Sequence, residues 1–148
     1  KIPFSEVQKI IQRIFDNDTV DQLYLTPDSI HSCAEHSGIE LKWRPILNWT
    51  DFETTTFDYS EQDFLDIAFA KAQPHEGKTI IITDECFKDK MAFSLFQFKD
   101  TIEFMEKIYP ALYNMQFQQP SDFIFIQPDI DLITMIHHEG KRTKFSKS

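Results

Sequence analysis

Two adjacent histidines near the C-terminus have side chains suited to acid–base or metal chemistry. His137 and His138 precede Glu139, and an earlier acidic pair, Asp84 and Glu85, directly follows a β-branched run. Carboxylates at the end of a buried strand often serve as metal ligands or catalytic groups, and imidazole is a general base near neutral pH. His137 or His138 with Asp84 or Glu85 therefore indicates one candidate function, that of a small hydrolase or metal enzyme.

The spacing of these groups argues against such a site. Adjacent strand residues point to opposite faces of a sheet, so His137 and His138 are not expected to chelate one ion. No nucleophile paired with a base is recognisable. His31, Cys33 and His36 lie close together, but their spacing is poor for a metal site on a helix. The sequence predicts no catalytic residue, no metal and no cofactor.

An acidic, aromatic-rich segment between Pro45 and Ala70 is the most unusual feature of the sequence. It contains six carboxylates and no Lys or Arg. Carboxylates steer and pair with a basic protein, and buried aromatic side chains supply much of the affinity of an interface. The alternative is a solvated acidic face whose aromatic side chains point into the core. The predicted partner-binding residues are Asp51, Glu53, Asp58, Tyr59, Glu61, Asp63 and Asp66.

The overall charge also favours a basic protein partner. The chain has 24 acidic and 15 basic side chains, which gives a net charge of −9. Nucleic acid is not an expected partner, because binding a phosphate backbone depends on Lys and Arg that displace counterions. The basic residues at the C-terminus are interpreted as offsetting the acidic body or fraying into solvent; they are Lys141, Arg142, Lys144 and Lys147.

Several properties indicate a cytoplasmic protein without a membrane segment. No stretch approaches the ~20 apolar residues that cross a bilayer, and the N-terminal residues lack the apolar region of a signal peptide. Cys33 and Cys86 are too few for a disulfide framework. They are expected to be reduced and buried, and a single bridge between them remains the alternative.

The spacing of apolar residues predicts the elements that position these groups. Helices are expected over 4–16, from Pro27 to about Ser37, from Ser60 to 72, and from Asp100 to Pro110, where the proline should kink or stop the helix. Alternating or β-branched runs predict strands over 20–25, 39–43, 79–83, 90–98, 123–126, 132–137 and 142–145.

The order of these elements predicts the fold class. In the second half of the chain the order is β-β-α-β-β-β with short connections, which favours an antiparallel or mixed sheet packed against helices. The chain of 148 residues has no internal repeat or linker, so residues 1–148 are predicted to form a single α+β domain. One core is expected to contain Phe93, Leu95, Ile124, Ile126, Ile133 and Met135.

The C-terminal residues resemble those of a known group of proteins. An apolar strand after Asp122, a Gln-Pro-Asp turn and a second strand from Leu132 that ends in His-His-Glu-Gly resemble the closing hairpin of small bacterial immunity proteins. These proteins inhibit the toxins of contact-dependent and other polymorphic systems. The resemblance implies a non-catalytic cytoplasmic protein that binds one cognate toxin, which the acidic segment leads us to expect is a basic nuclease. A structural or adaptor domain that forms a homodimer is the remaining alternative.

Overall fold

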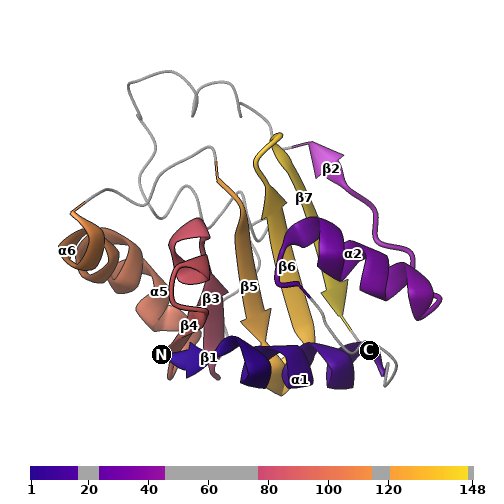
Figure 1. Cartoon of the computed structure of the whole chain (residues 1–148), viewed down its shortest axis with the longest axis horizontal. Coiled ribbons are helices and arrows are strands. Elements are labelled where there is room, and N and C mark those ends of the chain that lie inside the picture. The colour runs from indigo at the N-terminus through magenta and orange to yellow at the C-terminus, as the bar shows by residue number, and fades with distance from the viewer. Residues whose placement is uncertain (17–23, 46–76, 115–120, 147–148) are drawn as a thin grey trace.

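A seven-stranded sheet is the centre of the fold. The computed structural model describes residues 1–16, 24–45, 77–114 and 121–146 (Figure 1). Along the sheet the strand order is β1-β4-β3-β5-β6-β7-β2, and every neighbouring pair is antiparallel. The predicted α+β class with an antiparallel sheet packed against helices is confirmed.

The strands differ greatly in length. The two edge strands have two residues each, whereas β6 and β7 have six. The strands are β1 (Ile2–Pro3), β2 (Arg44–Pro45), β3 (Thr79–Ile82), β4 (Met91–Leu95), β5 (Phe123–Gln127), β6 (Leu132–His137) and β7 (Lys141–Ser146). Each strand predicted from residue 79 onward is therefore present, although β4 ends three residues early.

The strand predicted over 39–43 is wrong. These residues are irregular, and backbone pairing with β7 begins only at Arg44. Leu41 is buried and Ile39 packs against the core, so the alternation reflects side chains that point inward. The carbonyl of Lys42 instead accepts a hydrogen bond from the Thr143 hydroxyl at 2.9 Å. Of the strand predicted over 20–25, only Tyr24 and Leu25 are described, and neither is in a strand.

The first two helices agree with their predictions. Helix α1 (Phe4–Phe15) buries one apolar face and ends at Asp16, which has the left-handed φ of 55°. Helix α2 (Pro27–His36) begins at Thr26, whose side chain accepts a hydrogen bond from the Ser29 N–H at 3.2 Å. Two residues beyond its end, Gly38 has φ +77°, a conformation that glycine adopts without strain. The helix predicted from Ser60 lies outside the described residues.

The third helical region continues past Pro110, so of the two predicted outcomes, a kink or a stop, the stop is wrong. A 3-10 turn (Phe98–Asp100) leads into α5 (Thr101–Glu103), a π-helical segment η3 (Phe104–Ile108) and α6 (Tyr109–Tyr113). Proline lacks an N–H and clashes with the carbonyl four residues earlier in an α-helix. The wider π turn changes the hydrogen-bond pattern before Pro110, which then lies in the first turn of α6.

Apolar side chains pack against both faces of the sheet. On one face Ile81 stands opposite Phe93 and Phe125, and the Phe93 ring packs on Phe104 of η3 with centroids 4.7 Å apart. On the other face Phe145 of β7 packs on Phe15 of α1, with centroids 4.9 Å apart. In Figure 1, α1 runs across the strands on this second face. The helices therefore cover the sheet from both sides.

The predicted core residues belong to one apolar core but to different faces of the sheet. The β3–β4 register places Phe93 and Leu95 on the face that η3 covers, with Leu95 only partly buried. The other four residues lie on the face toward α1; they are Ile124, Ile126, Ile133 and Met135. In the part of the chain that the structure describes, no helix is long and apolar enough to cross a membrane.

Candidate functional site

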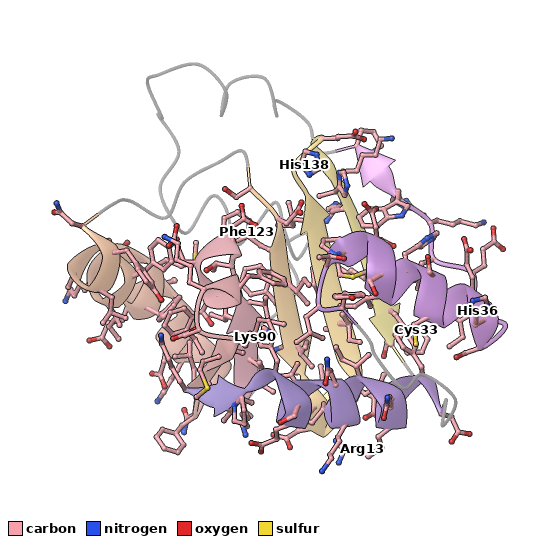
Figure 2. All side chains as sticks on the ribbon, in the orientation of Figure 1. Arg13, Cys33, His36, Lys90, Phe123 and His138 are labelled. Atoms are coloured by element: carbon pink, nitrogen blue, oxygen red, sulfur yellow. The ribbon has the colours of Figure 1, made fainter. Side chains whose placement is uncertain are left out.

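Histidines and carboxylates from distant parts of the chain meet at one end of the sheet. Because the strands are antiparallel, the end of β3, the start of β5 and the end of β6 lie together. Figure 2 shows His138 at the β6–β7 turn, at the same end of the sheet as Phe123. Asp84, Asp122 and His138 are close enough for their charges to interact. The structure thus brings together Asp84 and His138, which the sequence indicated as an alternative catalytic pair.

Asp122 holds the β6–β7 turn against the start of β5. Its Oδ1 accepts a hydrogen bond from the backbone N–H of His138 at 2.7 Å, and the same oxygen lies 3.1 Å from Nδ1 of the His138 ring. One carboxylate therefore fixes both the backbone and the side chain of His138. Asp122 was not predicted as a site residue, although it is an acid that directly precedes an apolar run.

Asp84, just after the end of β3, is hydrogen-bonded to the residues just before β5. Its carboxylate accepts hydrogen bonds from the backbone N–H of Asp122 and from the Ser121 hydroxyl. The pKa of Asp84 is nevertheless raised, first because its surroundings exclude water and second because of the nearby negative charge of Asp122. The hydrogen bonds to Asp84 therefore do not offset the combined effect of desolvation and the charge of Asp122.

His137 is buried and both of its ring nitrogens have partners. Nδ1 accepts a hydrogen bond from the backbone N–H of Glu139 at 3.2 Å, which leaves the proton of the neutral ring on Nε2. Nε2 lies 3.5 Å from a carboxylate oxygen of Asp28 on α2. The ring also packs edge-on against Trp43, with centroids 5.8 Å apart. His137 therefore joins β6, the β6–β7 turn and α2.

The side chains of His137 and His138 lie on the same side of the turn, contrary to the prediction of opposite faces. Their rings stack with centroids 4.1 Å apart and an interplanar angle of 30°. Strand alternation ends at His137, since His138 already belongs to the turn. Within the described residues, Asp122, His137 and His138 form a group whose ligand atoms all lie within 4.8 Å of one another, close enough to surround a metal ion.

The other residues considered from the sequence lie elsewhere. Glu85 forms an ion pair with Lys88 at 2.6 Å rather than joining the cluster. His31 lies 3.4 Å from Glu35 and 3.3 Å from the carbonyl of Leu41, so it connects α2 to the segment that follows. Cys33 points into the core, and His36 is exposed at the end of the helix.

Cys33 and Cys86 are buried thiols and are not joined by a disulfide bond. The Cys86 sulfur accepts a hydrogen bond from the Thr83 N–H at 3.3 Å. Burial raises the pKa of the Cys86 thiol. The expected reduced and buried state agrees with the structure, and the alternative of a single bridge does not.

The residues predicted to bind a partner all lie outside the described residues; they are Asp51, Glu53, Asp58, Tyr59, Glu61, Asp63 and Asp66. The described strand β2 leads into their segment. Pro45 of β2 pairs with Lys141, which in turn pairs with His137. The chain therefore enters the acidic segment at the end of the sheet that carries Asp84 and Asp122.

Comparisons with known proteins add no relative. A scan against protein-family models, a search of curated proteins and a search of solved structures each found no match.

Proposed function

We propose that this chain is a non-catalytic immunity protein of the cytoplasm that binds and neutralises a basic toxin, such as a nuclease. The proposal is supported chiefly by the concentration of carboxylates at one end of the sheet. Asp28, Asp84, Asp122 and Glu139 gather around the two histidines. The pKa of Asp84 is raised first by desolvation and second by the negative charge of Asp122. The acidic segment that begins after Pro45 adds six further carboxylates in the sequence.

A basic partner would relieve the repulsion among these carboxylates. A nuclease must hold phosphates, so its active-site cleft presents Lys and Arg. An inhibitor that supplies carboxylates to such a cleft associates rapidly, and the association rate falls as salt rises. The aromatic side chains of the acidic segment would then slow dissociation, because buried anchors carry most of the affinity.

The hydrogen bonds of the cluster support a structural role for its histidines. His137 uses Nδ1 to accept the Glu139 N–H, and Asp122 uses one oxygen to hold His138. These contacts fix the strand ends and the turn that present the carboxylates. Asp28, Asp84 and Glu139 are the exposed members. Asp84 accepts hydrogen bonds from Asp122 and Ser121, so Asp28 and Glu139, whose side chains are 82% and 62% exposed, are the members to reverse.

Charge reversal at the exposed members tests the proposal. The variant Asp28→Lys/Glu139→Lys is compared with Glu6→Lys/Glu106→Lys, which makes the same change of charge at exposed positions on other elements. Asp28 and Glu6 are matched further, since each is the acidic residue in the first turn of its helix. The probe is the protein encoded by the neighbouring gene, produced together with the immunity protein.

We expect the first variant to associate at least about tenfold more slowly at low salt and to lose protection of cell growth, while the matched control keeps both. Circular dichroism and thermal unfolding establish that both variants are folded. Equal binding by the two variants, or no binding by the wild-type protein, would refute the proposal.

The Asp122, His137 and His138 group favours divalent-metal binding as a second candidate function. Imidazole nitrogen and carboxylate oxygen are the ligands that zinc uses in catalytic sites. Binding would require one ring nitrogen of His137 to exchange its contact, with Glu139 at Nδ1 or with Asp28 at Nε2, for the metal. Protein purified without chelators should contain less than about 0.2 equivalents of zinc if the first proposal holds. About one equivalent that is lost in His138→Ala, but not in His36→Ala, would support the second candidate.

A further inference from the structure

A cationic hollow lies at the β2 edge of the sheet, on the face opposite to His137. The hollow has a volume of about 430 Å³. Four basic side chains line it, together with one acid and one hydroxyl; the lining residues are Lys42, Arg44, Arg142, Lys144, Glu40 and Thr143. In a chain with a net charge of −9, this hollow gathers four of the 15 basic residues.

The register of β2 and β7 forces these cations together. Arg44 stands directly opposite Arg142, and directly opposed residues of an antiparallel pair point to the same face. Lys144 is two residues beyond Arg142 in the same strand, so its side chain is also on that face. The hydrogen bond from the Thr143 hydroxyl to the Lys42 carbonyl holds Lys42 alongside. Like charges directly opposite each other destabilise a sheet.

Lys144 shows the electrostatic effect of this arrangement. The side chain is half-buried, and the pKa of Lys144 is lowered, first because its surroundings exclude water and then because of the charge of Arg142. The basic C-terminal residues are therefore not a frayed tail. As far as Ser146 they form β7, which pairs with β6 on one side and β2 on the other (Figure 1).

We propose that the cationic hollow binds a small, multiply charged phosphate anion of the pyrophosphate type. Guanidinium groups form paired hydrogen bonds with phosphate oxygens, and lysines add point charges. The volume is within the range of small-molecule sites. A long nucleic acid is disfavoured, because the acidic remainder of the protein would repel its backbone. This inference does not depend on the proposed function, which uses the acidic end of the sheet.

Titration calorimetry with inorganic pyrophosphate tests the inference. Wild-type protein should bind one pyrophosphate saturably at low salt, and binding should weaken as salt rises. Arg44→Gln/Arg142→Gln should weaken binding at least about tenfold, because it removes both guanidinium groups. The matched control Lys99→Gln/Lys107→Gln removes two exposed cations from other elements and should bind as the wild type does.

Two further measurements test the inference without the double arginine variant. Lys42→Gln changes an exposed side chain outside the strands and should also weaken binding, even if the double arginine variant does not fold. The pKa of Lys144, followed by NMR, should rise when pyrophosphate binds, because the bound anion favours the charged lysine. Absence of saturable binding, or an equal loss in the Lys99/Lys107 control, would overturn the inference.

Discussion

The His138 ring and the Asp122 carboxylate lie 3.1 Å apart, although 16 residues separate them in the sequence. The same carboxylate oxygen accepts the backbone N–H of His138 at 2.7 Å. The contact joins the start of β5 to the β6–β7 turn. This turn carries Glu139, one of the carboxylates proposed to bind the partner. The position of the turn that carries Glu139 therefore depends in part on this acceptor.

Replacing Asp122 with alanine should destabilise the protein. The variant removes the acceptor of both bonds from His138, and the loss of such bonds costs about 1–3 kcal/mol. Urea unfolding measures the change in the free energy of unfolding. Glu106→Ala, which removes an exposed carboxylate from another element, should change stability by less than about 0.5 kcal/mol. An equally small change in the free energy of unfolding for Asp122→Ala would contradict the prediction. It would show that water can accept the hydrogen bonds from His138 without a loss of stability.

Asp84→Asn should make the protein more stable near neutral pH. The pKa of Asp84 in the folded protein is raised above its ordinary value of 3.8, so the folded state holds this proton more tightly than the unfolded state does. Ionised Asp84 consequently opposes folding above its folded pKa, and this effect disappears as pH falls to below 3.8. Urea unfolding at about pH 7 and about pH 3 should show a difference between the two proteins only at the higher pH. If the two proteins differed in free energy of unfolding by the same amount at both pH values, the raised pKa of Asp84 would not be the cause of the difference.

Truncations on the two faces of the sheet should have additive effects. Phe93→Ala should cost about 3–5 kcal/mol and Ile133→Val about 0.5–1.5 kcal/mol, since both side chains are buried. The side chains pack on opposite faces, against different helices, so the double variant should equal the sum within about 0.5 kcal/mol. Chemical unfolding of the three variants provides the test. A clear departure from the sum would mean that the two faces are coupled through the sheet.

The two thiols should react slowly in the native protein. Cys33 and Cys86 are 3% and 0% exposed, and burial raises the pKa of Cys86, which reduces the reactive thiolate. A chromogenic disulfide reagent should modify both cysteines at once in denaturant but neither at a comparable rate without it. Rapid native labelling of either one would place that thiol at the surface.

Reversal of the acidic segment should abolish binding of the proposed toxin without unfolding the protein. The variant changes three acids of the segment to lysine, namely Asp58, Glu61 and Asp63. The change removes the negative charge that steers a basic partner. The control triple changes Asp16, Asp18 and Asp21 to lysine, an equal change of charge outside the segment. Binding is measured with the product of the neighbouring gene. Equal binding by both triples would show that the segment is not the interface.

Strong periodic patterns in the sequence were sufficient to predict much of the fold. The β-branched and alternating runs from residue 79 onward all form strands, and Thr26 with Pro27 marked the start of α2. The two-residue edge strands β1 and β2 are too short to show a period, so their pairing was not predictable. Ile39 and Leu41 alternated as in a strand because their side chains face the core, although their backbone does not pair.

The candidate site was predictable only where its residues follow a strand. Asp84 and His138 were identified because each lies at the end of a predicted strand. The contact between Asp28 and His137 joins residues more than a hundred positions apart, and neither residue carries a local signal for it. The pairing of Arg44 with Arg142 could not be predicted for the same reason. The register between two segments far apart in the sequence is set by the whole sheet.

The pairing of β1 with β4 has a consequence for synthesis on the ribosome. Ile2 pairs with Ala92, and β2 pairs with Lys141 and Arg142. When the first helix emerges, its apolar residues Val7, Ile11 and Ile14 have no sheet to cover until much later strands are made. Domains generally fold as units during translation, and here the N-terminal elements must wait for the C-terminal strands that they pair with or cover. A nascent chain stalled before β7 would therefore expose apolar surface that chaperones bind.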